Sequence, residues 1–260
     1  MADMTAARVI VTRPAAEAQR WTQALRQQGI EAESLPLIDI GPAPDPAAVT
    51  QAWQGLSTCH AVMFVSANAV QHFMALRGKA ILPITVRAWS TGPGTQAALL
   101  ATGWSPGQID SPSQEAGRFD SEALWALVAN QISPGQRVLI VRGADERGDL
   151  AGRDWLARQL QTSGLQVQQC VAYTRRPPAW TARQQALAQQ AFVEGAWWLF
   201  SSAEAARLLR QRCAYWPLAQ ARALATHPRI AERLQQEGWT QVVCVPAGLD
   251  QMVESIKSLP

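Results

Sequence analysis

Histidine, cysteine and lysine are scarce in this chain of 260 residues, which has three histidines and four cysteines. Cys59, Cys170, Cys213 and Cys244 form no C-x-x-C pair and stand singly among apolar neighbours. This pattern argues against a disulfide framework and a zinc site, and it indicates buried free thiols in a reducing compartment. We therefore expect no bound metal.

The chain also has few features that would direct it to a membrane or to nucleic acid. Lys79 and Lys257 are the only lysines, and the net charge of +3 comes from arginines that are spread along the chain. Met1–Ala7 lacks the pattern of a signal peptide, and no uncharged apolar run has the length of a membrane span. The sequence predicts a cytoplasmic protein without a nucleic-acid or membrane partner.

What the chain does contain is an internal repeat. Adding 135 to a position in the first half often gives the same residue: Leu25 and Leu160, Gly29 and Gly164, Ser66 and Ser201, Thr91 and Thr226, Pro93 and Pro228, Leu99 and Leu234, Gly103 and Gly238, Trp104 and Trp239. A repeat of this length predicts a duplicated fold. Small ligands often bind where two such domains meet.

Each copy alternates strands with helices, which predicts an α/β fold of two doubly wound parallel-sheet domains, flavodoxin-like and duplicated. Strands are expected at 8–12, 60–65, 85–90, 137–141, 197–200, 223–226 and 241–245. Helices are expected at 15–28, through Val70 and Phe73, from 93 to Gly103, around Trp155 and from Leu249.

Two extended segments flanked by prolines, 34–39 and 171–177, predict where the chain crosses between domains. One domain then holds residues 40–170, and the other holds 1–35 plus 176–260, with 36–39 and 171–175 as linkers. The alternative is two sequential halves divided near Ser133–Gly135. The segments occupy equivalent places in the repeat, which favours the split arrangement.

Several short motifs follow one another in a fixed order: Val11–Pro14, Phe64–Val70, Gly92–Thr95, Phe119–Glu122, Val138–Gly143, Gly152–Leu156, Tyr173–Arg175 and Leu199–Ser202. With this order and spacing, the chain resembles the uroporphyrinogen-III synthase family of tetrapyrrole and heme biosynthesis over essentially its whole length. The turn at Thr226–Arg229 and the insertion at 145–148 depart from the family pattern.

The resemblance implies a cofactor-independent, monomeric lyase with two α/β domains, a two-stranded linker and an active site between the domains. Its substrate would be hydroxymethylbilane, a linear tetrapyrrole with many carboxylates. The reaction would remove water, close the ring and invert the last pyrrole to give uroporphyrinogen III.

The resemblance carries the family's proposed tyrosine onto Tyr173, our first candidate for the acid that protonates the departing hydroxyl. A phenol is protonated at neutral pH and can donate a hydrogen bond. The alternative role of Tyr173 is to pack within the linker. Thr95 is the other catalytic candidate, although an aliphatic hydroxyl is a poor acid and could serve only as a hydrogen-bond partner.

The turns after the expected strands are candidate sites for the substrate's carboxylates, because free backbone N–H groups and helix dipoles attract anions there. The candidate residues are Ser66, Ala67, Asn68, Gly92, Gly94, Ser201, Ser202, Thr226 and His227. Arg13 and Arg142, each expected just after a strand, are further candidates. The alternatives are simple helix caps for Ser66, Ser201 and Thr226, and solvated charges for the two arginines.

Other functions fit the same fold. A non-catalytic two-domain protein that binds a small polyanionic ligand would share the architecture. A nucleotide-dependent enzyme is disfavoured because Gly92–Thr95 does not complete a G-x-G-x-x-G motif and the chain has no P-loop lysine. A flavodoxin-like electron carrier would bind a flavin, so the purified protein would be coloured.

Overall fold

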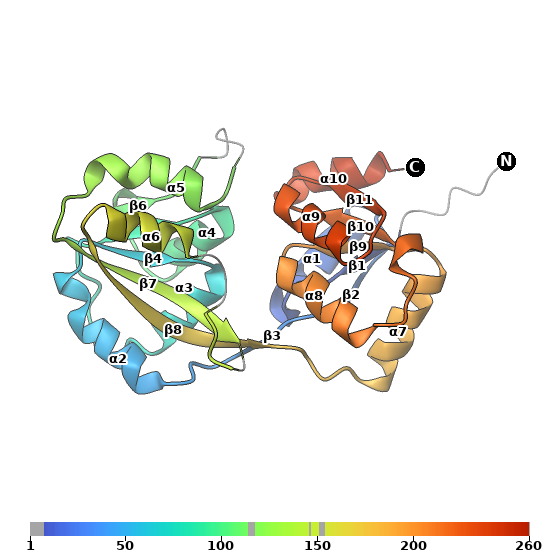
Figure 1. Cartoon of the computed structure of the whole chain (residues 1–260), viewed down its shortest axis with the longest axis horizontal. Coiled ribbons are helices and arrows are strands. Elements are labelled where there is room, and N and C mark those ends of the chain that lie inside the picture. Colours follow the sequence, from blue (N-terminus) through green and yellow to red (C-terminus); the bar gives the residue numbers. More distant parts are fainter. Residues whose placement is uncertain (1–7, 114–117, 146, 151–153, 260) are drawn as a thin grey trace. The chain divides into compact units, whose positions relative to one another are not determined.

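The computed structural model describes residues 8–113, 118–145, 147–150 and 154–259, which form two compact units (Figure 1). Unit 1 contains the chain up to Asp39 and again from Pro177 onward, and unit 2 is Ile40–Arg176. The chain thus passes from one unit to the other twice. A division into sequential halves near Ser133 does not describe it.

Unit 1 is built on a five-stranded sheet in the order β11-β10-β9-β1-β2, with parallel pairing throughout. The hydrophobic core on one of its faces is closed by α1 and α10. The strands are β1 (Val9–Val11), β2 (Ala32–Ser34), β9 (Trp197–Phe200), β10 (Arg222–Ala225) and β11 (Gln241–Cys244), and the helices are α1 (Ala15–Gln27), α7 (Ala182–Val193), α8 (Ala203–Arg212), α9 (Pro228–Gln236) and α10 (Leu249–Lys257).

Unit 2 contains a six-stranded sheet in the order β3-β8-β7-β4-β5-β6. Alternate residues of β4 point to opposite faces: Phe64 packs with α2, α3 and α4, whereas Met63 packs with α5 and α6. The strands are β3 (Asp39–Gly41), β4 (Ala61–Phe64), β5 (Arg87–Ser90), β6 (Ile109–Asp110), β7 (Arg137–Asp145) and β8 (Gln166–Arg176), and the helices are α2 (Pro46–Gly55), α3 (Ala67–Ala75), α4 (Pro93–Ala101), α5 (Ser121–Val128) and α6 (Trp155–Thr162).

Strands that match under the repeat hold the same place in both sheets. One sheet reads β2-β1-β9-β10-β11, and the other reads β8-β7-β4-β5-β6 beside the extra strand β3. Each unit therefore joins the first two strands of one copy to the last three strands of the other. The order in unit 1 is the 2-1-3-4-5 order of flavodoxin-like sheets. The expected fold class is confirmed.

Glycines at equivalent positions of the repeat terminate equivalent helices. Gly29 after α1 and Gly164 after α6 have φ of 78° and 83°, and Gly103 after α4 and Gly238 after α9 have φ of 99° and 100°. These left-handed values are readily available only to glycine, which commonly terminates helices in this way. The two copies thus share their helix stops as well as their strand order.

The second copy differs from our expectation where its strands are longest. β7 continues to Asp145, beyond the predicted end at Val141, and β8 includes residues 171–175, which we had expected to form a linker. The two strands pair in parallel along their length, with a register shift between Arg142 and Gly143. The expected insertion at 145–148 follows β7, and its Glu146 lies outside the described residues.

Three of the four cysteines are buried as free thiols, but Cys244 is exposed, so the prediction was wrong for that residue. Cys244 ends β11, which is the edge strand of its sheet. Burial raises the pKa of the Cys170 and Cys213 thiols to about 11. No described helix has the length and apolar character that a membrane span requires.

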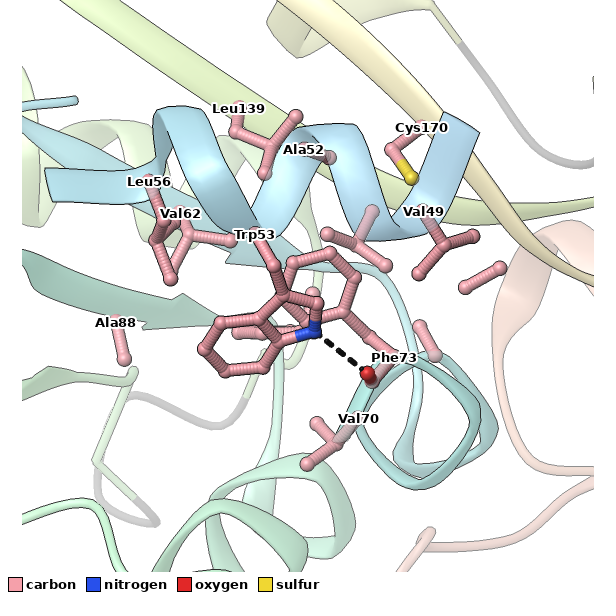
Figure 2. Packing of buried hydrophobic residues seen from close by; sticks show 14 of the residues in the cluster. Val49, Ala52, Trp53, Leu56, Val62, Val70, Phe73, Ala88, Leu139 and Cys170 are labelled. Carbon is pink, nitrogen blue, oxygen red and sulfur yellow. Dashed lines mark hydrogen bonds between the residues drawn. The ribbon is translucent and has the colours of Figure 1, made fainter. Parts of the chain in front are cut away.

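The core of unit 2 includes a buried indole with a defined hydrogen bond. Trp53 of α2 stacks on Phe73 of α3 with ring centroids 4.6 Å apart, and its Nε1–H donates to the Phe73 carbonyl at 2.8 Å (Figure 2). This contact joins the two helices that lie on the same face of the sheet. The Nε1 of Trp89 in the same unit is also buried but has no hydrogen-bond partner in the described chain.

These two tryptophans provide a matched test of the hydrogen bond. Both Trp53→Phe and Trp89→Phe lose indole volume, but only Trp53→Phe also loses a buried hydrogen bond, after which the Phe73 carbonyl keeps the Leu76 N–H at 3.2 Å. We expect Trp53→Phe to lower the free energy of unfolding by about 0.5–1.5 kcal/mol more than Trp89→Phe does. Urea unfolding followed by far-UV circular dichroism measures the difference, and equal losses would contradict the prediction.

Candidate functional site

A cavity of about 230 Å³ opens in unit 2 at the carboxyl ends of its parallel strands. It lies where β4 and β7, which are distant in sequence, become neighbours in the sheet. Ligands of doubly wound folds bind outside the carboxyl ends of the strands at such a switch point. Seven polar residues line the cavity: Ser66, Thr91, Asp120, Ser121, Arg142, Tyr173 and Arg175.

Tyr173 lies in the wall of this cavity. It comes from β8 and is 3% exposed, and its phenol oxygen lies 3.1 Å from Ser66 Oγ. Its ring stacks on His72 of α3 with centroids 5.7 Å apart. Burial lowers the pKa of His72, so the imidazole beside the phenol is neutral at neutral pH. The tyrosine is held on one side by a hydroxyl and on the other by an uncharged ring.

Gly143 makes room for the Tyr173 ring. The register shift after Arg142 places Gly143 opposite Tyr173 in the β7–β8 pair. A Cβ on Gly143 would lie 2.6 Å from two ring carbons of Tyr173. No other residue type could stand there without displacing the tyrosine.

Ser66 has two roles in this part of the site. Its Oγ accepts a hydrogen bond from the Ala69 N–H at 3.1 Å, which caps α3, and the same oxygen contacts the Tyr173 phenol. Ala67 and Asn68 form the first turn of α3. The cap therefore fixes the hydroxyl that meets the tyrosine.

Arg142 is neither at the end of a strand nor solvated. It lies inside β7 and is 2% exposed, because β7 continues past it to pair with β8. Its Nη1 donates to Asp154 Oδ1 at 2.5 Å and to Gln169 Oε1 at 2.8 Å. A buried guanidinium that is paired in this way is fixed in position at the cavity wall.

Asp120 supplies a carboxylate to the same cavity. It is 7% exposed, and it accepts hydrogen bonds from the Ala123 N–H at 2.9 Å and from Arg118 Nη2 at 2.9 Å. Burial alone would raise the pKa of this carboxyl, but the two hydrogen bonds outweigh burial and hold the pKa below its ordinary value. Asp120 is therefore ionised at neutral pH.

The other candidates of unit 2 lie at the start of α4, after β5. Gly92 is the N-cap residue and Gly94 is in the first turn, where a Cβ would meet nothing within 4 Å. Thr95 is 7% exposed and is not among the described residues that line the cavity. The structure thus brings Ser66 and Arg142 together with Tyr173 but leaves Thr95 apart from them.

The remaining candidates belong to unit 1, where the expected caps are shifted by one residue. Ser202 caps α8 by accepting from the Glu204 N–H at 3.2 Å, and His227 Nδ1 caps α9 by accepting from the Arg229 N–H at 3.2 Å. Ser201 and Thr226 precede these caps, so the alternative reading of both as helix caps was wrong. Both turns follow neighbouring parallel strands.

Arg13, also in unit 1, lies two residues after the end of β1 and packs on α1. Its guanidinium is 4.1 Å from the centroid of the Trp21 ring, and Nη1 donates to Glu17 Oε2 at 3.1 Å. Burial lowers the pKa of this guanidinium, which nevertheless stays protonated at neutral pH. Arg13 is thus ordered on α1 and is not a solvated charge.

Sequence reasoning did not select four of the polar residues that line the cavity. Thr91 matches Thr226 in the repeat, and that correspondence could have identified it. Asp120, Ser121 and Arg175 stand in motifs that we had already used for the resemblance, Phe119–Glu122 and Tyr173–Arg175. The described residues contain no cluster of histidine, cysteine, aspartate and glutamate that could hold a metal ion.

Comparisons with known proteins agree on one family. A family model described as uroporphyrinogen-III synthase HemD matches residues 19–254 of this chain. A uroporphyrinogen-III synthase of Proteus mirabilis is 28% identical over 171 residues, which cover 64% of this chain and 79% of that protein.

Two solved structures have the same fold. A mutant uroporphyrinogen III synthase from the extremely thermophilic bacterium Thermus thermophilus aligns with a TM-score of 0.61 at 15% identity, covering 97% of this chain and 98% of that one. A uroporphyrinogen-III synthetase from Helicobacter pylori aligns with a TM-score of 0.53 at 16% identity, covering 98% of this chain and all of the other.

The contact between Gly143 and Tyr173 can be tested by adding one methyl group. Gly143→Ala should lower the free energy of unfolding by about 1–3 kcal/mol, because the Tyr173 ring or the β7–β8 pair must shift. Gly55→Ala is a suitable control, since a Cβ there meets nothing within 4 Å and φ is −85°. Urea unfolding of both variants gives the comparison, and an unchanged Gly143→Ala protein would refute the close contact.

Proposed function

The chain belongs to the uroporphyrinogen-III synthase HemD family, and we propose that it cyclises hydroxymethylbilane to uroporphyrinogen III with Tyr173 as the proton donor. The observation that carries the assignment of Tyr173 is its buried phenol in the wall of the cavity at the switch point of unit 2. The reaction needs an acid for the departing hydroxyl, anchors for carboxylates and enforced geometry against direct closure. The first two of these needs have candidate residues in the described chain.

The first step breaks the bond between carbon and oxygen at the hydroxymethyl group. The bonding electrons leave with the oxygen, which takes the Tyr173 proton and departs as water. The lone pair of the ring nitrogen forms the new double bond, so the first ring becomes a cationic azafulvene and the tyrosine becomes a phenolate. General acid catalysis of this kind contributes about 10² to 10⁴ in rate.

The later steps form carbon–carbon bonds and return the proton. The substituted carbon of the last ring attacks the electrophilic carbon, which gives a spiro intermediate. The bond from this carbon to its original methylene bridge then breaks, and the methylene forms a new bond to the unsubstituted α-carbon of the same ring, so that this ring is inverted. Loss of a proton restores the aromatic pyrrole, and the phenolate is the base that regains it. Ser66, within hydrogen-bond distance of the phenol oxygen, would stabilise the phenolate between the two transfers.

The substrate's carboxylates need several anchors. In the cavity, Arg142 and Arg175 offer guanidinium groups, which suit carboxylate recognition. A volume of about 230 Å³ is below the usual range of ligand pockets and accommodates only part of a tetrapyrrole. We assign other carboxylates to the backbone N–H groups at Ser66–Asn68 and Gly92–Gly94, and to Arg13, Ser201–Ser202 and Thr226–His227 of unit 1.

We also propose that the protein acts as a monomer in the cytoplasm without a cofactor. The free thiols of Cys59, Cys170 and Cys213 support a reducing compartment. The assay that tests the overall function supplies hydroxymethylbilane and measures the isomers of the cyclised product. Formation of the type III isomer supports the cyclase function. Formation of only the type I isomer would instead favour the alternative, a non-catalytic protein that binds a polyanionic ligand.

Replacing Tyr173 separates chemistry from packing. Tyr173→Phe should slow turnover by about 10² to 10⁴, since it removes the acid but keeps the ring. The residual product should remain type III, because ring inversion depends on how the substrate is folded. Tyr215→Phe is the matched control: Tyr215 is 99% exposed and is the other of the two tyrosines in the chain.

The Tyr173 experiment has two informative failures. Full activity of Tyr173→Phe would show that Tyr173 only packs within the structure and that its hydroxyl is not the acid. A large change in melting temperature would show that the phenol is needed for folding, and the rate could then not be assigned to acid catalysis.

Carboxylate binding by the turns predicts graded effects. Thr226→Ala and Ser202→Ala should each reduce kcat/KM about tenfold, as expected for one hydrogen bond to a charged group. Gly94→Ala should reduce it more, because a Cβ that meets no protein atom would stand between backbone N–H groups and the substrate. Melting temperatures should be unchanged for Gly94→Ala, and unchanged activity would refute the role of this turn.

A further inference from the structure

The proposed reaction creates a positive charge that none of the groups given a role so far would stabilise. Ionisation of the hydroxymethyl group leaves the first pyrrole ring cationic, with the charge shared by its nitrogen. Tyr173 and Ser66 act at the departing oxygen, and Arg142 and Arg175 are themselves cations. Asp120 is the negatively charged side chain among the described residues that line this cavity.

A carboxylate in this wall is at first sight unfavourable, because the substrate carries many carboxylates of its own. Capping explains only part of its presence. Asp120 Oδ1 caps α5 by accepting from the Ala123 N–H, but asparagine and serine cap helices about as well as aspartate does. The negative charge therefore calls for a separate explanation.

The same unit contains an aspartate cap that shows the difference. Asp45 caps α2 by accepting from the Ala47 and Ala48 N–H groups at 3.0 and 3.1 Å. It is exposed and does not line the cavity. Asp45 and Asp120 thus share the capping role but differ in burial and in access to the candidate site.

We propose that the Asp120 carboxylate accepts a hydrogen bond from the N–H of the substrate's first pyrrole ring and stabilises the cation that forms there. The inference rests on the proposed cyclase function. No additional proton moves: Tyr173 gives its proton to the departing hydroxyl, the ring nitrogen keeps its hydrogen, and the carboxylate faces the resulting N–H⁺. The phenolate, the cation and the water together carry no net charge, and neither do the tyrosine and the hydroxymethyl group from which they form.

Such a contact favours the transition state over the bound substrate. A neutral pyrrole N–H forms an ordinary hydrogen bond to a carboxylate, but the bond strengthens as the nitrogen becomes positive. The cap holds the carboxylate in place beforehand, so little reorganisation is required when the charge develops. Asp120 would therefore act mainly on kcat.

Asp120→Asn tests the charge while keeping the cap. We expect kcat for type III product to fall by about 10² relative to the native protein, with KM changed by less than about threefold. The melting temperature should change little, because asparagine replaces the cap and Arg118, whose side chain is 61% exposed, forms a weak surface pair. Asp45→Asn, the matched control, should retain full kcat.

Two further variants decide between charge and structure. Asp120→Ser also caps the helix without a charge, so it should repeat the loss of kcat even if the asparagine variant folds poorly. Arg118→Ala removes the exposed partner but leaves the carboxylate and the cap that holds it, so it should retain kcat within about threefold. A loss in Arg118→Ala as large as that in Asp120→Asn would show that the ion pair matters and would overturn the inference.

The remaining outcomes distinguish the inference from the proposed function. If the native protein gives type III product and both neutral Asp120 variants match Asp45→Asn in kcat, only the inference is overturned. A rise in KM at constant kcat would also overturn it, because Asp120 would then bind substrate and cation equally. If the native protein gives only the type I isomer, the proposed function fails, and the role of Asp120 fails with it.

Discussion

The pairing of β7 with β8 is the constraint on which the candidate site depends. These are the longest strands of unit 2, and their register shifts between Arg142 and Gly143 so that a residue without a side chain faces Tyr173. The shift gives the phenol its place beside Ser66, and it occurs where the buried Arg142 reaches the cavity wall. The place of the Tyr173 ring in the cavity wall thus follows from one irregularity in a parallel ladder.

Much of the fold could be predicted because duplication leaves simple signals. The repeat located matching strands and the glycines that end matching helices, and the φ values of Gly29 and Gly164 differ by only 5° (83° against 78°). We predicted the two places where the chain crosses between domains from the prolines that flank extended segments. Residues 171–175 were expected to be extended, but no local pattern indicated that they would pair with β7 as part of β8, because strand length is set by the pairing partner and not by propensity alone.

The candidate site was predictable only in part, for a related reason. Tyr173 and Ser66 could be proposed from a motif and from a strand-to-helix turn, each a local feature. The burial of Arg142 depends on Asp154 and Gln169, which contribute from the start of α6 and from β8. The place of Asp120 depends on where α5 begins relative to β4 and β7. Such juxtapositions arise from tertiary packing, which the spacing of residues in the sequence does not specify.

Structural and chemical roles coincide at several positions of this site. Ser66 caps α3 and contacts the phenol, and Asp120 caps α5 and lines the cavity. A cap fixes its side chain through backbone N–H groups, so each helix start also provides a rigid support for a polar group. Alanine at such a position removes the cap and the polar group together, and its effect on activity then includes a loss of stability of about 1 kcal/mol. Substitutions that preserve the cap, such as asparagine for aspartate, are therefore the ones that report on chemistry in this fold.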